Sequence, residues 1–288
     1  MYKKQIKVLV LPNIENIDSI FIDKDIEVTK AYYSDLEFRF SGEEVAIMHK
    51  GIDIKLFDFV WISSYWTSRD LAYTVQLYLD FHTIPHTIVE QSTSKVSDQM
   101  VFALNKVPAP NSFYIENHEM HNHIESIEEI CGYPMIMKDI KGCAGKGSAF
   151  IRNREELVEK AGARNLNKKF MFQSFIENEF DWGVLVSDGK VVSAERSYPK
   201  DGEFRNNVGC KEIFVGIEEV PVDVVNIAIS TAQLLKLKWS RSDILLDKQN
   251  NSPYILEINR FPGITEGSTE VSGAWEYISK TIQLTNSL

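Results

Sequence analysis

The chain has 288 residues, of which 44% are hydrophobic, and its formal charge is −10. This length suits one or two domains with substantial cores. The acidic balance argues against a general nucleic-acid binder and against a protein that binds anionic membranes, because both need a basic surface. The three cysteines lie far apart without a CxxC pair. We therefore expect neither a disulfide framework nor a zinc site, and a reducing, cytoplasmic environment fits.

The first ninety residues have the pattern of a small α/β unit. Ile6–Leu11 is an apolar run of strand length that stops at Pro12, too soon for a signal-peptide core or a membrane span. Two strand-like runs flank the turn residues Ser41–Glu43, which predicts a hairpin. Phe57–Ile62 predicts a buried strand, and apolar residues at helical spacing predict a helix over Arg69–His82.

A glycine-rich loop over Gly142–Gly147 follows a predicted strand over Pro134–Lys138. Glycines let backbone N–H groups approach an anion closely, and lysines supply positive charge, so the loop could bind phosphate. It is not a Walker A loop, since Gly147 is followed by Ser148 and alanine in place of Lys and Ser/Thr, and it does not have the GxGxxG pattern of a dinucleotide fingerprint. Small lysine-bearing loops also occur without any ligand, and that alternative stays open.

The C-terminal half alternates further strands and helices. Phe170–Ile176 predicts a strand, and Asp188-Gly189 between two apolar runs predicts a hairpin with a type I′ turn. Pro221–Lys236 and Ala274–Leu284 have the apolar spacing of amphipathic helices. Earlier in the chain, Asn153 precedes a run with acidic residues in its first turn, which predicts a capped helix.

A hairpin near the C-terminus carries polar residues inside apolar strands. Glu257 and Asn259 are two residues apart, so their side chains share one strand face, and Asp243 lies on the preceding strand. Oxygen ligands on a rigid sheet suit a hard divalent cation such as Mg²⁺. The alternative is a half-exposed hairpin whose polar residues face water.

The order of these features resembles the ATP-grasp superfamily, in particular the RimK-like and glutathione-synthetase-like carboxylate–amine ligases. The most specific matching stretches are Leu256–Asn259, followed by Pro262-Gly263, and Phe204–Asn207. The resemblance implies an α/β protein with an ATP-grasp fold, in which two α+β lobes clasp ATP after a small α/β domain. The implied domains are 1–91 (preceding domain), 92–172 (N-lobe with the phosphate loop) and 173–288 (C-lobe with the metal hairpin).

The resemblance also implies how ATP and its metal ion are held. One or two Mg²⁺ ions, or Mn²⁺ as an alternative, would bind Asp243, Glu257 and Asn259. Asp181 would contact the nucleotide sugar. The residues implied for the ATP phosphates are Lys95, Lys138 and, in the mobile loop, Gly145, Lys146, Gly147 and Ser148. The hinge that reads the adenine edge would be Gln173, Ser174, Phe175 and Ile176.

Three further residues are implied for the chemical step. Arg205 and Asn207 would lie near the γ-phosphate and the activated carboxylate, and Arg196 near the substrate carboxylate. Several positions depart from the family pattern, mostly on this side, among them Cys210 and Lys211 where a glycine pair is usual. Gly183 stands where arginine is common, and Trp239–Ser242 replaces the usual small apolar residues before the metal-binding aspartate.

The resemblance implies an ATP-dependent ligase that forms an amide or peptide bond through an acyl phosphate. Its substrates would be a carboxylate and an amine, on amino acids or peptides. Alternatives within the same fold are a peptide-maturation enzyme that makes side-chain ester or amide links, and a small-molecule kinase. We expect no nucleic-acid or membrane partner, and a homo-oligomer remains open.

Overall fold

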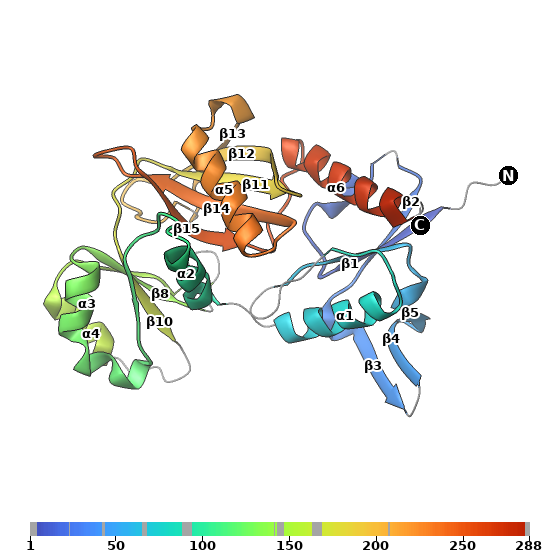
Figure 1. Cartoon of the computed structure of the whole chain (residues 1–288), viewed down its shortest axis with the longest axis horizontal. Helices are drawn as coiled ribbons and strands as arrows, with labels where there is room; N and C mark the ends of the chain where they lie inside the picture. Colours follow the sequence, from blue (N-terminus) through green and yellow to red (C-terminus); the bar gives the residue numbers. More distant parts are fainter. Residues whose placement is uncertain are drawn as a thin grey trace.

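The computed structural model describes residues 5–22, 24–41, 44–64, 68–87, 94–140, 142, 147–162, 169–206 and 208–285. Figure 1 shows the first domain on the right, the N-lobe with α3 and α4 at the lower left, and the C-lobe above the N-lobe. No helix within these residues combines the length and apolar character that crossing a bilayer requires.

The first domain contains a parallel sheet and a smaller antiparallel sheet. The parallel strands, in the order β2–β1–β6, are Ile26–Lys30, Ile6–Leu11 and Phe59–Ile62. The antiparallel strands are β3 (Leu36–Ser41), β4 (Glu44–His49) and β5 (Ile52–Asp53), and helix α1 spans Arg69–Phe81. The apolar run of β1 fits burial on both faces: Leu9 packs in the cluster with α1, and Val8 in a second cluster.

The N-lobe is an antiparallel sheet with two helices. Its strands, in the order β7–β10–β8–β9, are Ser112–Tyr114, Phe170–Ser174, Met135–Asp139 and Ala149–Ile151. Its helices are α3 (Ile124–Cys131) and α4 (Arg154–Gly162). The predicted N-cap is confirmed, because Asn153 Oδ1 accepts a hydrogen bond from the Glu156 backbone N–H at 2.9 Å.

The C-lobe is a five-stranded antiparallel sheet with helix α5 (Val222–Leu234) on one face. Its strands, in the order β13–β12–β11–β14–β15, are Lys211–Val215, Lys190–Tyr198, Asp181–Ser187, Trp239–Leu246 and Pro253–Asn259. The predicted β11–β12 hairpin is confirmed: Asp188 and Gly189 both have positive φ, 47° and 79°, as a type I′ turn requires.

Two helices tie these units together across long sequence distances (Figure 1). Helix α2 (Lys95–Leu104) buries Phe102 in the C-lobe core, although the domain boundary predicted at residue 92 assigns this helix to the N-lobe. Helix α6 (Thr269–Thr285) packs in one cluster with the first domain and the C-lobe sheet. There Trp61 meets Trp239 edge-on at 5.4 Å between ring centroids. The C-lobe is thus anchored to both of its neighbours.

Candidate active site

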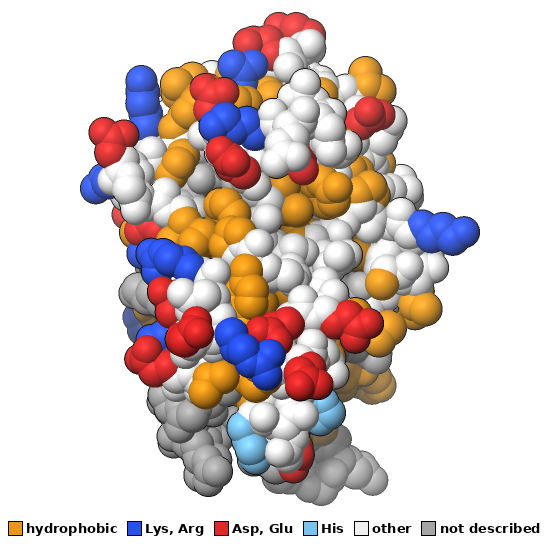
Figure 2. Space-filling model, turned by 90° about the vertical axis from the view of Figure 1, so that its left-hand side faces the viewer, with side chains coloured by type: hydrophobic (Ala, Val, Ile, Leu, Met, Phe, Trp, Pro, Cys, Tyr) orange, Lys and Arg blue, Asp and Glu red, His pale blue; other side chains and the backbone are white. Residues whose placement is uncertain are grey.

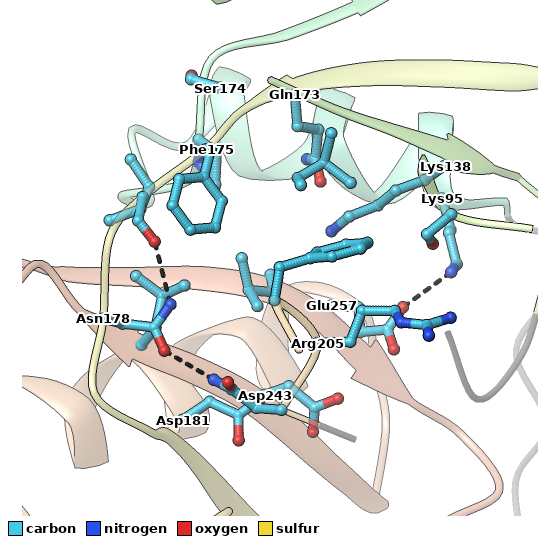
Figure 3. Close-up of a pocket in the computed structure, with 18 residues that line it drawn as sticks. Lys95, Lys138, Gln173, Ser174, Phe175, Asn178, Asp181, Arg205, Asp243 and Glu257 are labelled. Atoms are coloured by element: carbon cyan, nitrogen blue, oxygen red, sulfur yellow. Dashed lines mark hydrogen bonds and ion pairs between the residues drawn. The ribbon is translucent and has the colours of Figure 1, made fainter. Parts of the chain in front are cut away.

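A pocket opens between the two lobes and gathers most of the residues expected to bind nucleotide (Figure 3). In the close-up, Gln173 and Lys138 approach from the N-lobe side, and Asp181 and Asp243 from the C-lobe side. The described lining residues are Lys95, Pro110, Ile136, Lys138, Ser148, Gln173, Ser174, Phe175, Ile176, Asn178, Asp181, Phe204, Arg205, Asn206, Asp243, Leu245, Leu256 and Glu257.

The four predicted hinge residues line one end of this pocket. Gln173 is the second-last residue of β10, its side chain is buried, and its Nε2 donates to Ser112 Oγ at 2.9 Å. Its Oε1 is buried and has no hydrogen-bond partner among the described residues. Phe175 packs edge-on against Phe150, with 5.0 Å between ring centroids. An apolar wall beside an unsatisfied amide oxygen can receive a flat heterocycle that bears a hydrogen-bond donor.

Two lysines reach the middle of the pocket from different elements. Lys95 is the first residue of α2, and its Nζ lies 3.0 Å from Glu257 Oε2. Lys138 projects from β8, and burial lowers its pKa to about 8, although the nearby Glu257 carboxylate opposes that shift. The pocket therefore contains two lysine amines, one from α2 and one from β8. The Lys138 amine loses its charge in mildly alkaline solution.

The expected metal ligands converge on one face of the β14–β15 hairpin. Asp243 is the register partner of Glu257, and Asn259 Nδ2 donates to Asp243 Oδ2 at 3.1 Å. Burial, followed by repulsion from Glu257 and Asp181, raises the pKa of Asp243 well above its ordinary value. Burial also opposes ionisation of Glu257, but Lys95 and Lys138 outweigh it and keep the pKa of Glu257 below its ordinary value.

This donor set fits a hard cation in its chemistry. Two carboxylates and one amide leave oxygens free, because the Asn259 amide uses its nitrogen toward Asp243. Within the described ranges, no group of three or more His, Cys, Asp or Glu side chains could hold a metal ion. The hairpin itself offers three ligand side chains, and phosphate or water oxygens would complete the coordination of a cation.

Asp181 and Arg205 also line the pocket, each with its own partners. Burial, followed by the Glu195 charge, raises the pKa of Asp181 to about 7. Arg205 donates from Nε and Nη2 to the Glu203 carboxylate at 2.9 and 2.7 Å, and its guanidinium lies 5.3 Å from the Phe204 ring centroid. Its side chain is thereby held in one orientation at the pocket wall.

The phosphate loop is described only in part. Ser148 lines the pocket, and Gly147 has φ +81° with its carbonyl accepting the Asp139 backbone N–H at 3.3 Å. Three other predicted site residues, Gly145, Lys146 and Asn207, lie outside the described residues. Their proposed contacts with phosphate stay predictions from the sequence.

Arg196 is not brought into the pocket. It lies on β12 one residue from Glu195, so the two side chains point to opposite faces of the sheet. Its guanidinium packs 4.8 Å from the Trp182 ring centroid and lies 3.4 Å from the Glu219 carboxylate. The arginine that lines a cavity beside the metal hairpin is instead Arg241, from the stretch that departs from the family pattern.

A buried ion pair that was not predicted from the sequence connects two elements of the site. Arg260 donates from both terminal nitrogens to Asp98, at 2.9 and 2.7 Å, and both residues are buried. Asp98 lies one turn after Lys95 in α2, and Arg260 follows Asn259 at the end of β15. The pair therefore ties the helix that carries Lys95 to the strand that carries the metal ligands.

The outer face of the two lobes is partly apolar. Figure 2 shows hydrophobic side chains across the middle of this face, with charged side chains mainly above and below them.

Comparison with known proteins identifies the family of the chain. A profile for the RimK-like ATP-grasp domain matches residues 92–278. The chain belongs to the RimK-like ATP-grasp family. The resemblance inferred from the sequence is confirmed, and so is the predicted enzyme class, an ATP-dependent ligase. A protein named probable alpha-L-glutamate ligase, from Legionella pneumophila (strain Corby), is 28% identical over 70% of this chain and 68% of its own length.

Solved structures confirm the predicted ATP-grasp fold. The ATP-grasp ligase PsnB, complexed with minimal precursor, superimposes with a TM-score of 0.67 at 16% identity, over 96% of this chain and all of that chain. D-alanine–D-alanine ligase from Bacillus anthracis gives a TM-score of 0.65 at 13% identity over 99% of both chains. Because these matches extend over nearly the whole chain, the first domain is part of the shared architecture.

Proposed function

We propose that this ATP-grasp ligase activates a carboxylate with ATP as an acyl phosphate and transfers the acyl group to an amine. A carboxylate oxygen attacks the γ-phosphorus while the bond to the β-phosphate oxygen breaks, and ADP leaves. The amine nitrogen then attacks the acyl carbon, the C–O bond to phosphate breaks, and the amine loses its proton. The products are an amide, ADP and phosphate.

The observation that carries the proposal is the meeting of two lysines and a carboxylate hairpin in one pocket. Lys95 and Lys138 are placed to hold ATP phosphates, which repel the incoming carboxylate unless cations offset their charge. Asp243, Glu257 and Asn259 would hold Mg²⁺, which would supply positive charge to stabilise the phosphates during transfer. A structure of PsnB contains Mg and ADP, and this supports the same pair of ligands here.

The remaining pocket residues would orient the two substrates. The buried Gln173 and the Phe175 wall suit the adenine end, and Asp181 suits the sugar. Arg205, held by Glu203, would lie near the transferred phosphoryl group. Phosphoryl transfer needs little beyond positioning and charge stabilisation, and this set of side chains would supply both in the activation step.

The test is ADP release measured over a panel of amino acids and short peptides. A ligase needs a carboxylate and an amine together, and hydroxylamine in place of the amine should trap a hydroxamate. Accumulation of a phosphorylated product without a hydroxamate would favour a kinase of the same fold. Lys138→Ala should weaken ATP binding by about tenfold or more, whereas Lys280→Ala, at an exposed ion pair with Asp188, should not.

A further inference from the structure

A second cavity adjoins the nucleotide pocket on the same face of the C-lobe sheet. Its volume is about 170 Å³, and it shares Asp181, Asp243 and Glu257 with the nucleotide pocket. Its other described lining residues are Gly183, Glu195, Ser197, Glu212, Arg241 and Asn259. An occupant of this cavity would therefore lie beside the metal hairpin, next to the end of the pocket where phosphoryl transfer is proposed.

The lining of this cavity is strongly acidic. Its described residues supply five carboxylates and one guanidinium. That guanidinium is already shared, because Arg241 donates to Glu195 Oε1 at 3.0 Å and also to the buried Glu270 carboxylate. With a divalent cation on Asp243 and Glu257, the other three carboxylates, when ionised, still outnumber the single guanidinium. It is therefore suited to a cation and unsuited to a carboxylate.

Glu195 presents an unpaired, buried acceptor to this cavity. Glu195 is only 3% exposed and lines the cavity. Its Oε2 has no hydrogen-bond partner among the described residues. A buried acceptor left unpaired costs about 1–3 kcal/mol. Burial raises the pKa of Glu195 to about 7 even though Arg241 opposes the shift. A hydrogen-bond donor with positive charge would satisfy this oxygen.

The neighbouring strand makes room for this carboxylate. Gly183 on β11 is the register partner of Glu195, and a Cβ there would lie 2.6 Å from Glu195 Oε1. The missing side chain thus lets the Glu195 carboxylate lie across the sheet beside Arg241.

The spacing of the carboxylates favours an organic cation over a second metal ion. In the part of the chain that the structure describes, no three acidic, His or Cys side chains are grouped closely enough to hold a metal. The acceptors instead surround a space, and a primary ammonium directs its three N–H donors outward to such a shell. Ser197, buried on the same face, adds a hydroxyl acceptor.

We propose that this cavity binds the acceptor substrate as a primary alkylammonium beside the site of acyl-phosphate formation, where one N–H proton passes to a carboxylate of the lining before the neutral nitrogen attacks. The proposal rests on the ligase function proposed above and assigns its amine subsite. It also accounts for the departures at Gly183 and at Arg241. The glycine leaves space for Glu195, and Arg241 orients the Glu195 carboxylate.

The probe for the test is n-butylammonium, compared with neutral 1-butanol, by ligand-observed NMR on the full chain with Mg²⁺ and adenylyl imidodiphosphate. Wild-type protein should bind the ammonium at least about tenfold more tightly than the alcohol. Glu195→Gln keeps the side-chain shape, removes the charge, and should lower ammonium affinity about tenfold. Glu218→Gln, the same change at an exposed site outside both cavities, is the matched control and should change nothing.

A second variant guards against misfolding of Glu195→Gln. Glu212 is exposed at the mouth of the cavity, so Glu212→Gln should fold normally and weaken ammonium binding by a smaller factor. Equal binding of ammonium and alcohol, or unchanged binding in both cavity variants, would overturn the proposal. The proposal would also be overturned if added Mg²⁺ displaced the ammonium stoichiometrically from protein that is already saturated with the nucleotide analogue. None of these outcomes touches ATP-dependent ADP release, so failure of the amine subsite and failure of the ligase function are separable.

Discussion

Asp243 and Glu257 lie directly opposite each other across the β14–β15 hairpin, as register partners on adjacent strands. Like charges in this arrangement repel and destabilise a sheet. Lys95 offsets part of the charge through Glu257, but the pKa of Asp243 remains raised by burial and by Glu257. The opposed carboxylates therefore lower the stability of the metal-free fold, and a bound cation would offset their repulsion.

The first prediction follows from this repulsion. At pH values where both carboxylates are ionised, Asp243→Asn should raise the stability of the metal-free protein by about 1 kcal/mol, because it removes one of two opposed charges. The same change should abolish the gain in melting temperature that Mg²⁺ with adenylyl imidodiphosphate gives the wild-type protein. Thermal melts with and without these ligands measure both effects. A variant that is less stable without metal, yet still stabilised by the ligands, would contradict the metal assignment.

The second prediction concerns pH. Burial lowers the pKa of Lys138 to about 8, so this amine is charged below pH 8 and neutral above it. If its charge holds phosphate, nucleotide affinity should fall as pH rises through 8. Lys138→Arg should remove that fall, because a guanidinium stays protonated. Calorimetric titration with adenylyl imidodiphosphate at pH values below and above 8 measures the difference, and identical pH profiles for both proteins would exclude the phosphate role.

Much of the site was predictable because its spacing is local. Glu257 and Asn259 share a face through strand alternation alone, and the hairpin places Asp243 opposite Glu257. Lys138 could be placed on a strand from the apolar residues before it. These inferences need only a few neighbouring residues, and the structure brings Lys95, Lys138, Asp181, Asp243 and Glu257 to one pocket.

The missed features all depend on pairing between distant segments. Which face of β12 meets the pocket is set by its register with β11, so the sequence alone could not separate Glu195 from Arg196. Arg241 meets Glu195 from a strand 46 residues away, and Asp98 meets Arg260 over 162 residues. A charged residue inside a predicted buried strand, such as Arg241, was the available signal. The sequence did not indicate that Glu195 is the partner of Arg241.

The third prediction tests the Asp98–Arg260 pair as a structural tie. Asp98→Ala should destabilise the protein by about 3–5 kcal/mol, because it leaves a buried guanidinium without its bidentate carboxylate. The matched control is Asp18→Ala, which breaks the exposed pair with Lys30 and should cost less than about 1 kcal/mol. Urea unfolding measures both changes. Similar losses in the two variants would mean that the buried pair does not hold α2 against β15.

The last prediction tests the close approach of Gly183 to Glu195. A Cβ at position 183 would lie 2.6 Å from Glu195 Oε1 and 2.9 Å from its Cγ. The glutamate cannot easily swing away, because it is buried and bonded to Arg241. Gly183→Ala should therefore cost about 1–3 kcal/mol in the free energy of unfolding. Gly263→Ala, where a Cβ would meet nothing within 4 Å, is the control and should cost little.

A double-mutant cycle decides whether that loss of stability comes from Glu195. In a Glu195→Ala background the obstructing carboxylate is absent, so Gly183→Ala should cost less than half of what it costs in the wild-type protein. The two residues are direct register partners, and coupling of this kind is expected only between side chains that touch. If Gly183→Ala costs the same in both backgrounds, the strain arises in the β11 backbone, and Gly183 does not serve to place the Glu195 carboxylate.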